Sequence, residues 1–148
     1  MKTKVLVIVG PTASGKSALA VAFAKKLGGE VISADSRQVY RGLNIGTGKI
    51  TRREMKGIWH HLLDVADPKK QFSIAEFKPL AERAIRKIQT RGRIPILVGG
   101  TGFWVDAVVF DHAIPAVPPN AILRKRLAKK RTRHRPSAWL RVFSCLLR

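Results

Sequence analysis

The sequence has few acidic residues and almost no cysteine. Nine Asp and Glu side chains stand against 29 Lys and Arg, and the one cysteine is Cys145. A single cysteine excludes a disulfide within the chain and is typical of cytoplasmic proteins. No apolar run reaches the length of about 18 residues that a membrane span needs. We therefore expect a cytoplasmic protein with no membrane partner.

The few acids are also unevenly distributed. Residues 1–111 hold 19 Lys and Arg together with all nine acids, whereas residues 112–148 hold ten Lys and Arg and no acid. The formal net charge of +20 favours a polyanionic partner such as RNA. The alternative is a basic surface without a specific partner. The 148 residues, 45% of them hydrophobic, suit one domain with a real core.

One stretch carries a motif for binding phosphate. Residues 10–17 fit the pattern of Gly, four residues and Gly-Lys-Ser. The apolar run 5–9 before them predicts a buried parallel strand, and the helix-forming run 18–27 follows. Backbone N–H groups of such a loop point at phosphate oxygens. We expect a di- or triphosphate to be bound by Gly10, Pro11, Thr12, Ala13, Ser14, Gly15, Lys16 and Ser17, with Mg²⁺ held through the hydroxyl of Ser17.

A second predicted strand, over residues 30–34, ends close to an acid. Ligands of open parallel sheets lie beyond the carboxyl ends of the strands, which places Asp35 and Gln38 near the phosphate motif. Asp35 is a candidate base or magnesium ligand. Equally, its carboxylate is suited to capping a following helix, and position alone does not separate these readings.

The remaining segments complete the prediction of an α/β fold, a parallel sheet of the phosphate-loop type flanked by helices. Two histidines, His60 and His61, lack a third ligand at a suitable spacing, which favours a structural or substrate-lining role over a metal site. A capping box joins Ser73 to Glu76. The predicted elements are a short helix over 51–56, a strand over 58–65, a helix from Ser73 to about Thr90, a strand over 94–98 and a helix over 103–110.

The strand over residues 94–98 lacks an acid at its end. Ordinary phosphate-loop ATPases carry one there to hold magnesium, whereas Gly99-Gly100-Thr101-Gly102 follow in this chain. This absence weakens the case for an ATP-hydrolysing motor. The glycines instead let the backbone approach a ligand at the same sheet edge.

Several segments together resemble the tRNA dimethylallyltransferases, also called tRNA isopentenyltransferases. The resemblance spans residues 4–110 and is carried by Val7 to Ser17, Ile32 to Thr47, His60 to Asp64 and Val98 to Gly102. Residues 35–42, Asp-Ser-Arg-Gln-Val-Tyr-Arg-Gly, are its most specific part.

The resemblance implies transfer of a dimethylallyl group from dimethylallyl diphosphate to N6 of the adenosine 3′ of the anticodon in tRNA. It implies that the phosphate motif, Thr12 included, holds the leaving diphosphate, and that Asp35 is the general base. Thr101 would border the channel where tRNA and donor meet, as a further catalytic position. The implied tRNA-binding residues are Asp35, Ser36, Arg37, Gln38 and Thr101.

Beyond residue 111 the sequence departs from this pattern. We expect a catalytic core over residues 1–111 and, over 112–130, a basic helix that begins a tRNA-binding helical insertion. The resemblance is expected to stop after Lys130. Residues 131–148 are interpreted as an atypical, disordered basic tail, produced by a frameshift, by premature termination or by an unusual truncation. A sheet lacking its completing strands predicts an exposed edge and low solubility.

Three other hypotheses remain open from the sequence. A small-molecule or nucleotide kinase would share the phosphate motif and the α/β core, and an adenylate isopentenyltransferase would share the chemistry. The last hypothesis is an inactive fragment that only binds phosphate or RNA. We expect a monomer.

Overall fold

The computed structural model describes residues 4–115 and 120–131. The chain divides into two units, Met1–Pro115 and Ala116–Arg148. The first contains β1 (Leu6–Val9), α1 (Lys16–Leu27), β2 (Gly29–Ser33), α2 (Arg52–Met55), β3 (His60–His61), α3 (Ile74–Thr90), β4 (Ile94–Gly99) and α4 (Gly102–Val109). In the second, the structure describes α5 (Ala121–Arg131), the expected basic helix. None of these helices is long and apolar enough to cross a membrane.

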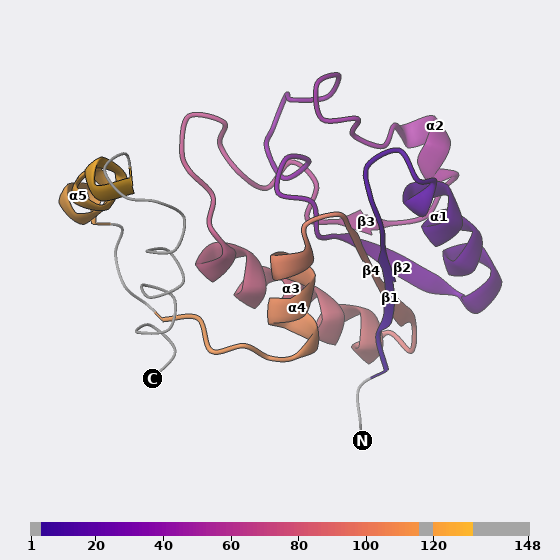
Figure 1. Ribbon diagram of the computed structural model, residues 1–148. Coiled ribbons are helices and arrows are strands. Elements are labelled where there is room, and N and C mark those ends of the chain that lie inside the picture. The colour runs from indigo at the N-terminus through magenta and orange to yellow at the C-terminus, as the bar shows by residue number, and fades with distance from the viewer. Residues whose placement is uncertain (1–3, 116–119, 132–148) are drawn as a thin grey trace. The chain divides into compact units, whose positions relative to one another are not determined.

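The four strands form one parallel sheet with the order β1-β4-β2-β3 (Figure 1). Val9 of β1 pairs with Gly99 of β4, and Ser33 of β2 pairs with Val98. The carboxyl ends of the three longer strands therefore meet at one edge of the sheet. The predicted α/β fold with a parallel sheet is confirmed.

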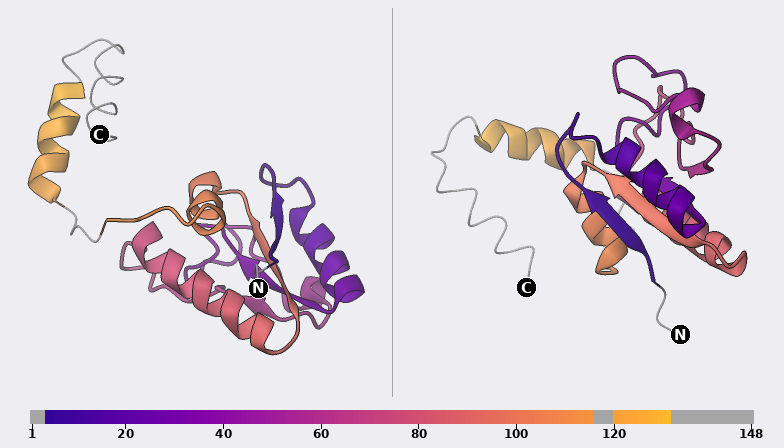
Figure 2. Two further views of the ribbon diagram at one scale, coloured as in Figure 1. Left: turned by 90° about the horizontal axis from the view of Figure 1, so that it is seen from below. Right: turned by 90° about the vertical axis from the view of Figure 1, so that its right-hand side faces the viewer.

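Helices cover both faces of the sheet (Figure 2). On one face, α1 packs Ala20 and Ala24 against Val31 and Ile96. On the other face, α3 and α4 pack against Ile32 and Leu97. There Phe77 of α3 stacks on Trp104 of α4, with ring centroids 4.3 Å apart. Adjacent residues of a strand thus pack into the two cores on opposite faces of the sheet, because side chains alternate between these faces.

The long helix α3 forms as the sequence predicts. The backbone N–H of Ser73 donates to the Glu76 carboxylate over 2.8 Å, the expected capping contact. Its buried side chains, Phe77, Ala81, Ala84, Ile85 and Ile88, recur at helical spacing. Pro79 lies inside the helix, which nevertheless runs without interruption to Thr90.

The strand expected over residues 58–65 is much shorter. Only His60 and His61 pair with β2. Leu62 and Asp64 have φ angles of 64° and 57°, in the left-handed region that an extended strand does not enter. Leu62 and Asp64 therefore end the strand after two residues.

A buried carboxylate, that of Glu30, lies at the start of β2, at the edge of the sheet away from the phosphate motif. Glu30 of β2 is 1% exposed, and its oxygens lie 2.6 Å from His61 Nε2, 3.2 Å from Arg91 and 3.1 Å from Arg93. Burial by itself raises the pKa of Glu30, but hydrogen bonds from His61 and Arg91 and their charges outweigh it and lower the pKa. Glu30 is therefore an ionised anchor for β3 and for the turn before β4.

We predict that Glu30→Gln lowers the free energy of unfolding by about 1–3 kcal/mol, because the hydrogen-bonding groups around it lose a charged partner. Glu82→Gln, on the half-buried outer side of α3, is the control and should change it by less than about 0.5 kcal/mol. Urea unfolding measures both.

The free energies of unfolding of the wild type and Glu30→Gln should differ by an amount that depends on pH. The pKa of Glu30 is lower in the folded chain than its ordinary 4.5. The ionised Glu30 therefore stabilises the fold fully at pH values above 4.5, and this stabilisation is lost as the pH falls through the lowered pKa. The gap between wild type and Glu30→Gln should shrink at pH about 3 compared with pH about 7. A gap that stays constant would contradict this role of Glu30.

Candidate active site

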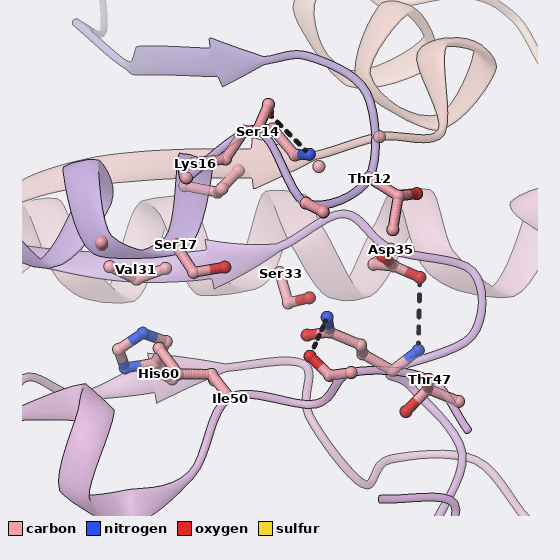
Figure 3. A pocket seen from close by; sticks show the side chains of 18 of the residues that line it. Thr12, Ser14, Lys16, Ser17, Val31, Ser33, Asp35, Thr47, Ile50 and His60 are labelled. Atoms are coloured by element: carbon pink, nitrogen blue, oxygen red, sulfur yellow. Dashed lines mark hydrogen bonds between the residues drawn. The ribbon is translucent and has the colours of Figure 1, made fainter. Parts of the chain in front are cut away.

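A cavity of about 290 Å³ lies at the carboxyl edge of the sheet. Figure 3 shows its walls, with Ser14, Lys16 and Ser17 on one side and Thr47 and Ile50 opposite. Asp35 and Thr12 lie towards one end of this view, and Val31 and His60 towards the other. The cavity therefore joins the predicted phosphate motif to the end of β2.

The motif forms the connection between β1 and α1. Ala13 and Gly15 have φ angles of 63° and 80°, which turn successive N–H groups to one side as in anion-binding nests. Helix α1 begins at Lys16, so its N-terminal N–H groups face the same loop. The Lys16 ammonium donates to the Pro11 carbonyl oxygen and lies 3.5 Å from Ser14 Oγ. This cation is thus folded over the loop that would bind the anion.

Close backbone contact at the end of β4 requires glycine. A Cβ on Gly99 would lie 2.3 Å from the carbonyl oxygen of Ala34, and backbone at that point cannot move aside cheaply. Gly100 faces the loop from the other side, where a Cβ would lie 3.4 Å from the carbonyl oxygen of Gly10. The two glycines let the ends of β1, β4 and β2 come together.

Asp35 caps a turn while lining the cavity. Its Oδ1 accepts the backbone N–H of Arg37 over 2.8 Å and of Gln38 over 3.4 Å. Residues 36–39 form a turn and Tyr40 follows as an isolated bridge. Of the two alternatives left open by the sequence, the helix cap is therefore wrong, because Asp35 caps a turn that does not continue into a helix. Both hydrogen bonds use Oδ1. Oδ2 accepts none from the part of the chain that the structure describes, which leaves it as the oxygen able to accept a proton.

Side-chain contacts tie the neighbouring loops to this turn. Gln38 Nε2 donates to the Gly48 carbonyl over 3.3 Å, and this contact holds residues 47–50 in the wall. Thr101 Oγ1 accepts the Ser36 N–H over 3.3 Å and lies 3.2 Å from Ser36 Oγ. The turn after β2 is therefore fastened to the turn after β4.

Not every predicted site residue lines the cavity. Thr12 to Ser17, Asp35 and Gln38 do, whereas Gly10, Pro11, Ser36, Arg37 and Thr101 lie around it and are not part of its lining. Sequence reasoning missed the lining residues Ser33, Thr47, Gly48, Ile50 and Leu63. They carry no chemical motif. Ser33 ends β2, Leu63 follows β3, and the other three belong to the loop over residues 41–50, so only the tertiary fold brings them together.

The two histidines are structural and lining residues in this fold. His60 Nδ1 donates to the Ile58 carbonyl over 2.9 Å, so the hydrogen of a neutral ring stands on Nδ1. Its Nε2 is buried and has no hydrogen-bond partner within residues 4–115 and 120–131, and burial lowers the pKa of this imidazole. His61 is held by Glu30. Among the described residues, no group of three His, Cys, Asp or Glu side chains is placed to hold a metal.

The oxygens available in the cavity nevertheless suit magnesium. Ser17 and Asp35 both line it, and hard oxygen donors are the ligands that Mg²⁺ prefers. This ion commonly takes only one or two protein ligands and fills its other positions with phosphate oxygens and water. A site built on Ser17 beside a bound phosphate is compatible with that donor set.

The fold and the cavity define an α/β protein in which a glycine-rich loop and a strand-end carboxylate share one pocket. A family model described as IPP transferase matches residues 38–144. The chain belongs to this family.

Individual relatives agree with the family. A tRNA dimethylallyltransferase of Geobacillus kaustophilus is 52% identical over 127 residues, covering 86% of this chain and 40% of the relative. One from Halalkalibacterium halodurans is 58% identical over 109 residues, covering 74% of this chain and 35% of the relative. The chain thus spans about 40% of the length of the first of these relatives.

Solved structures show the same fold. The full-length tRNA isopentenylpyrophosphate transferase from Bacillus halodurans superposes with a TM-score of 0.76 at 46% identity, covering 98% of this chain and 48% of that protein. A eukaryotic dimethylallyltransferase acting on tRNA gives a TM-score of 0.74 at 36% identity, covering 85% of this chain and 31% of that protein.

The family match and the match to an individual relative differ in extent. The family model reaches residue 144, whereas the match to the Geobacillus kaustophilus relative covers 127 residues, 86% of this chain. The expected end of the resemblance after Lys130 stays a prediction. The expected disorder of the tail concerns residues outside the described ranges, apart from Arg131, which ends α5.

We predict that Gly99→Ala lowers the free energy of unfolding by about 3 kcal/mol, as severe overpacking does. The reason is the 2.3 Å approach of the new Cβ to the Ala34 carbonyl oxygen. Gly46→Ala is the matched control, because a Cβ there meets nothing within 4 Å. Thermal unfolding compares the two, and equal stabilities would contradict the close approach of these strand ends.

Proposed function

We propose that this chain carries the donor site of a tRNA dimethylallyltransferase. The reaction moves a dimethylallyl group from dimethylallyl diphosphate to N6 of the adenosine 3′ of the anticodon. The observation that carries the proposal is that Lys16, Ser17 and Asp35 all line the same cavity. Family membership favours this function over a kinase.

The phosphate motif binds and neutralises the leaving diphosphate. An allylic diphosphate ionises readily once the charge on its leaving oxygens is stabilised. Loop N–H groups, the N-terminus of α1 and Lys16 supply positive potential, and Thr12 adds a hydroxyl at the rim. Lys16 exchanges its contact with the Pro11 carbonyl for the diphosphate. Bound Mg²⁺, held by Ser17, would add further charge neutralisation.

Asp35 acts on the acceptor. As the bond between the allylic carbon and the diphosphate oxygen breaks, the bond from adenine N6 to that carbon forms. N6 then carries an extra proton, which passes to Oδ2 of Asp35 as the general base. The proton, the prenyl group and the diphosphate are thereby all accounted for.

The residues around the cavity mouth hold the tRNA. The target base leaves its stack to reach the pocket, and Ser36 and Gln38 are suited to bind it as it enters. Arg37, exposed beside them, offers a cation to the RNA backbone. Thr101, fastened to Ser36, borders the entry.

We predict that Lys16→Ala weakens the binding of inorganic pyrophosphate about 10- to 100-fold, the range for losing a hydrogen bond between charged groups. Lys26→Ala is the control, since Lys26 is an exposed lysine at the far end of the same helix. Calorimetric titration measures both variants. Tighter binding of ATP than of pyrophosphate by the wild type would instead favour a kinase.

We predict that Asp35→Asn lowers the rate of prenyl transfer about 10²- to 10⁴-fold, the usual contribution of a general base. Asparagine keeps an oxygen for the Arg37 and Gln38 N–H groups, so the turn is preserved. Pyrophosphate affinity should stay unchanged, and a transfer assay with radiolabelled dimethylallyl diphosphate follows the rate. Transfer at the wild-type rate would show that another group takes the proton.

A further inference from the structure

A second cavity, of about 700 Å³, adjoins the candidate active site. Ile50, His60 and Leu63 line both cavities. The second one extends from this shared wall along α2 and the start of β3. A strand of nucleic acid with one base in the first cavity therefore has a neighbouring nucleotide within reach of the second.

Trp59 gives the second cavity an exposed aromatic wall. Its side chain is 65% exposed, although its carbonyl oxygen accepts the Val31 N–H over 2.9 Å. The backbone is thus fixed to β2 while the indole stays open to solvent. In the described part of the chain the one aromatic ring beside it is that of His61. The ring centroids lie 6.4 Å apart and the ring planes are tilted by 36°. Such a ring is a platform on which an unpaired base stacks.

The charge of this surface is positive. Lys49 and Arg52 line the cavity, and Arg53 and Lys56 lie exposed beside them. These four cations outnumber the two nearby acids. Asp64 pairs with Lys49 over 2.6 Å, and Glu54 accepts hydrogen bonds from Thr51 within the cap of α2. A second copy of this chain, with its own charge of +20, would be repelled, whereas a polyanion is attracted.

We propose that this surface, formed by Trp59, Arg52 and the cavity between them, binds the RNA strand beside the target adenosine. Trp59 stacks on the unpaired base of a neighbouring nucleotide, and Arg52 contacts a phosphate of the same strand. The proposal rests on the proposed function and names where the RNA runs outside the pocket. It assigns stacking to Trp59 and no part in the chemical step.

The test measures the affinity of the full chain for a fluorescein-labelled RNA hairpin with an adenosine in its loop, by fluorescence anisotropy. Trp59→Ala should weaken binding about fivefold to a hundredfold, the range for one lost base stack, and Trp59→Phe should restore most of it. Phe110→Ala is the matched control, because Phe110 is 68% exposed at the end of α4. It should bind as the wild type does.

Salt dependence tests the phosphate contact separately. Arg52→Ala should make the slope of log K against log salt less steep by about 0.7, the value for one phosphate of a single strand. Arg83→Ala, which removes an exposed arginine from α3, should leave the slope unchanged. Equal slopes for wild type and Arg52→Ala would overturn the assignment of Arg52.

The remaining outcomes separate this inference from the proposed function. Unchanged RNA affinity in Trp59→Ala, an equal loss in Phe110→Ala, or no RNA binding by the wild type would overturn the inference, whatever the pyrophosphate affinity. A dimer seen by sedimentation that Trp59→Ala abolishes, with unchanged RNA affinity, would assign the surface to a second copy and also overturn it. The expected RNA result with no prenyl transfer by the wild type would support the inference and overturn the proposed function.

Discussion

The approach of the β4 and β2 backbones at Gly99 and Ala34 is the constraint on which the site depends. Parallel pairing sets Val9 beside Gly99 and Ser33 beside Val98, and the missing side chain lets the strand ends close together. The loop after β1 and the turn after β2 are thereby brought to one cavity. Without that register, the phosphate motif and Asp35 would belong to separate surfaces.

The site divides its charges between two loops. The cationic side is local in sequence, because one glycine-rich loop supplies both the N–H groups and Lys16. The carboxylate comes from Asp35, just after β2. Hydrogen bonds from the backbone of the following turn fix its position. In the allylic transfer that we propose, one loop would stabilise the diphosphate that leaves and the other would accept the proton of the incoming amine. The positively charged surface around the exposed Trp59 would extend this arrangement toward the proposed RNA strand.

Local patterns predicted most of the fold. Helix α3 follows from its cap and its periodic apolar face, and β1, β2 and β4 follow from apolar runs that end in glycine or polar residues. The strand over residues 58–65 was overpredicted, because the left-handed backbone of Leu62 and Asp64 cannot be inferred from apolar content. The phosphate motif and Asp35 were found because their chemistry is concentrated in a few residues.

The other wall of the site could not be predicted. Thr47, Ile50 and Leu63 have ordinary side chains. The path of loop 41–50 brings the first two to the cavity, and the turn after β3 brings Leu63. The sequence singles out His60 only as half of a histidine pair. Its position in the cavity wall depends on the pairing of β3 with β2. The exposure of Trp59, which directly precedes β3, was likewise not indicated by any sequence pattern.

The most direct measurement is a titration of the ¹⁵N-labelled chain with magnesium pyrophosphate, followed through the amide chemical shifts. The account predicts the largest shifts at Thr12 to Ser17, smaller ones at Asp35 and Gln38 across the cavity, and no change in α3. Largest shifts away from the β1–α1 loop, on α2 or α5 for example, would contradict the claim that these strand ends build a diphosphate site.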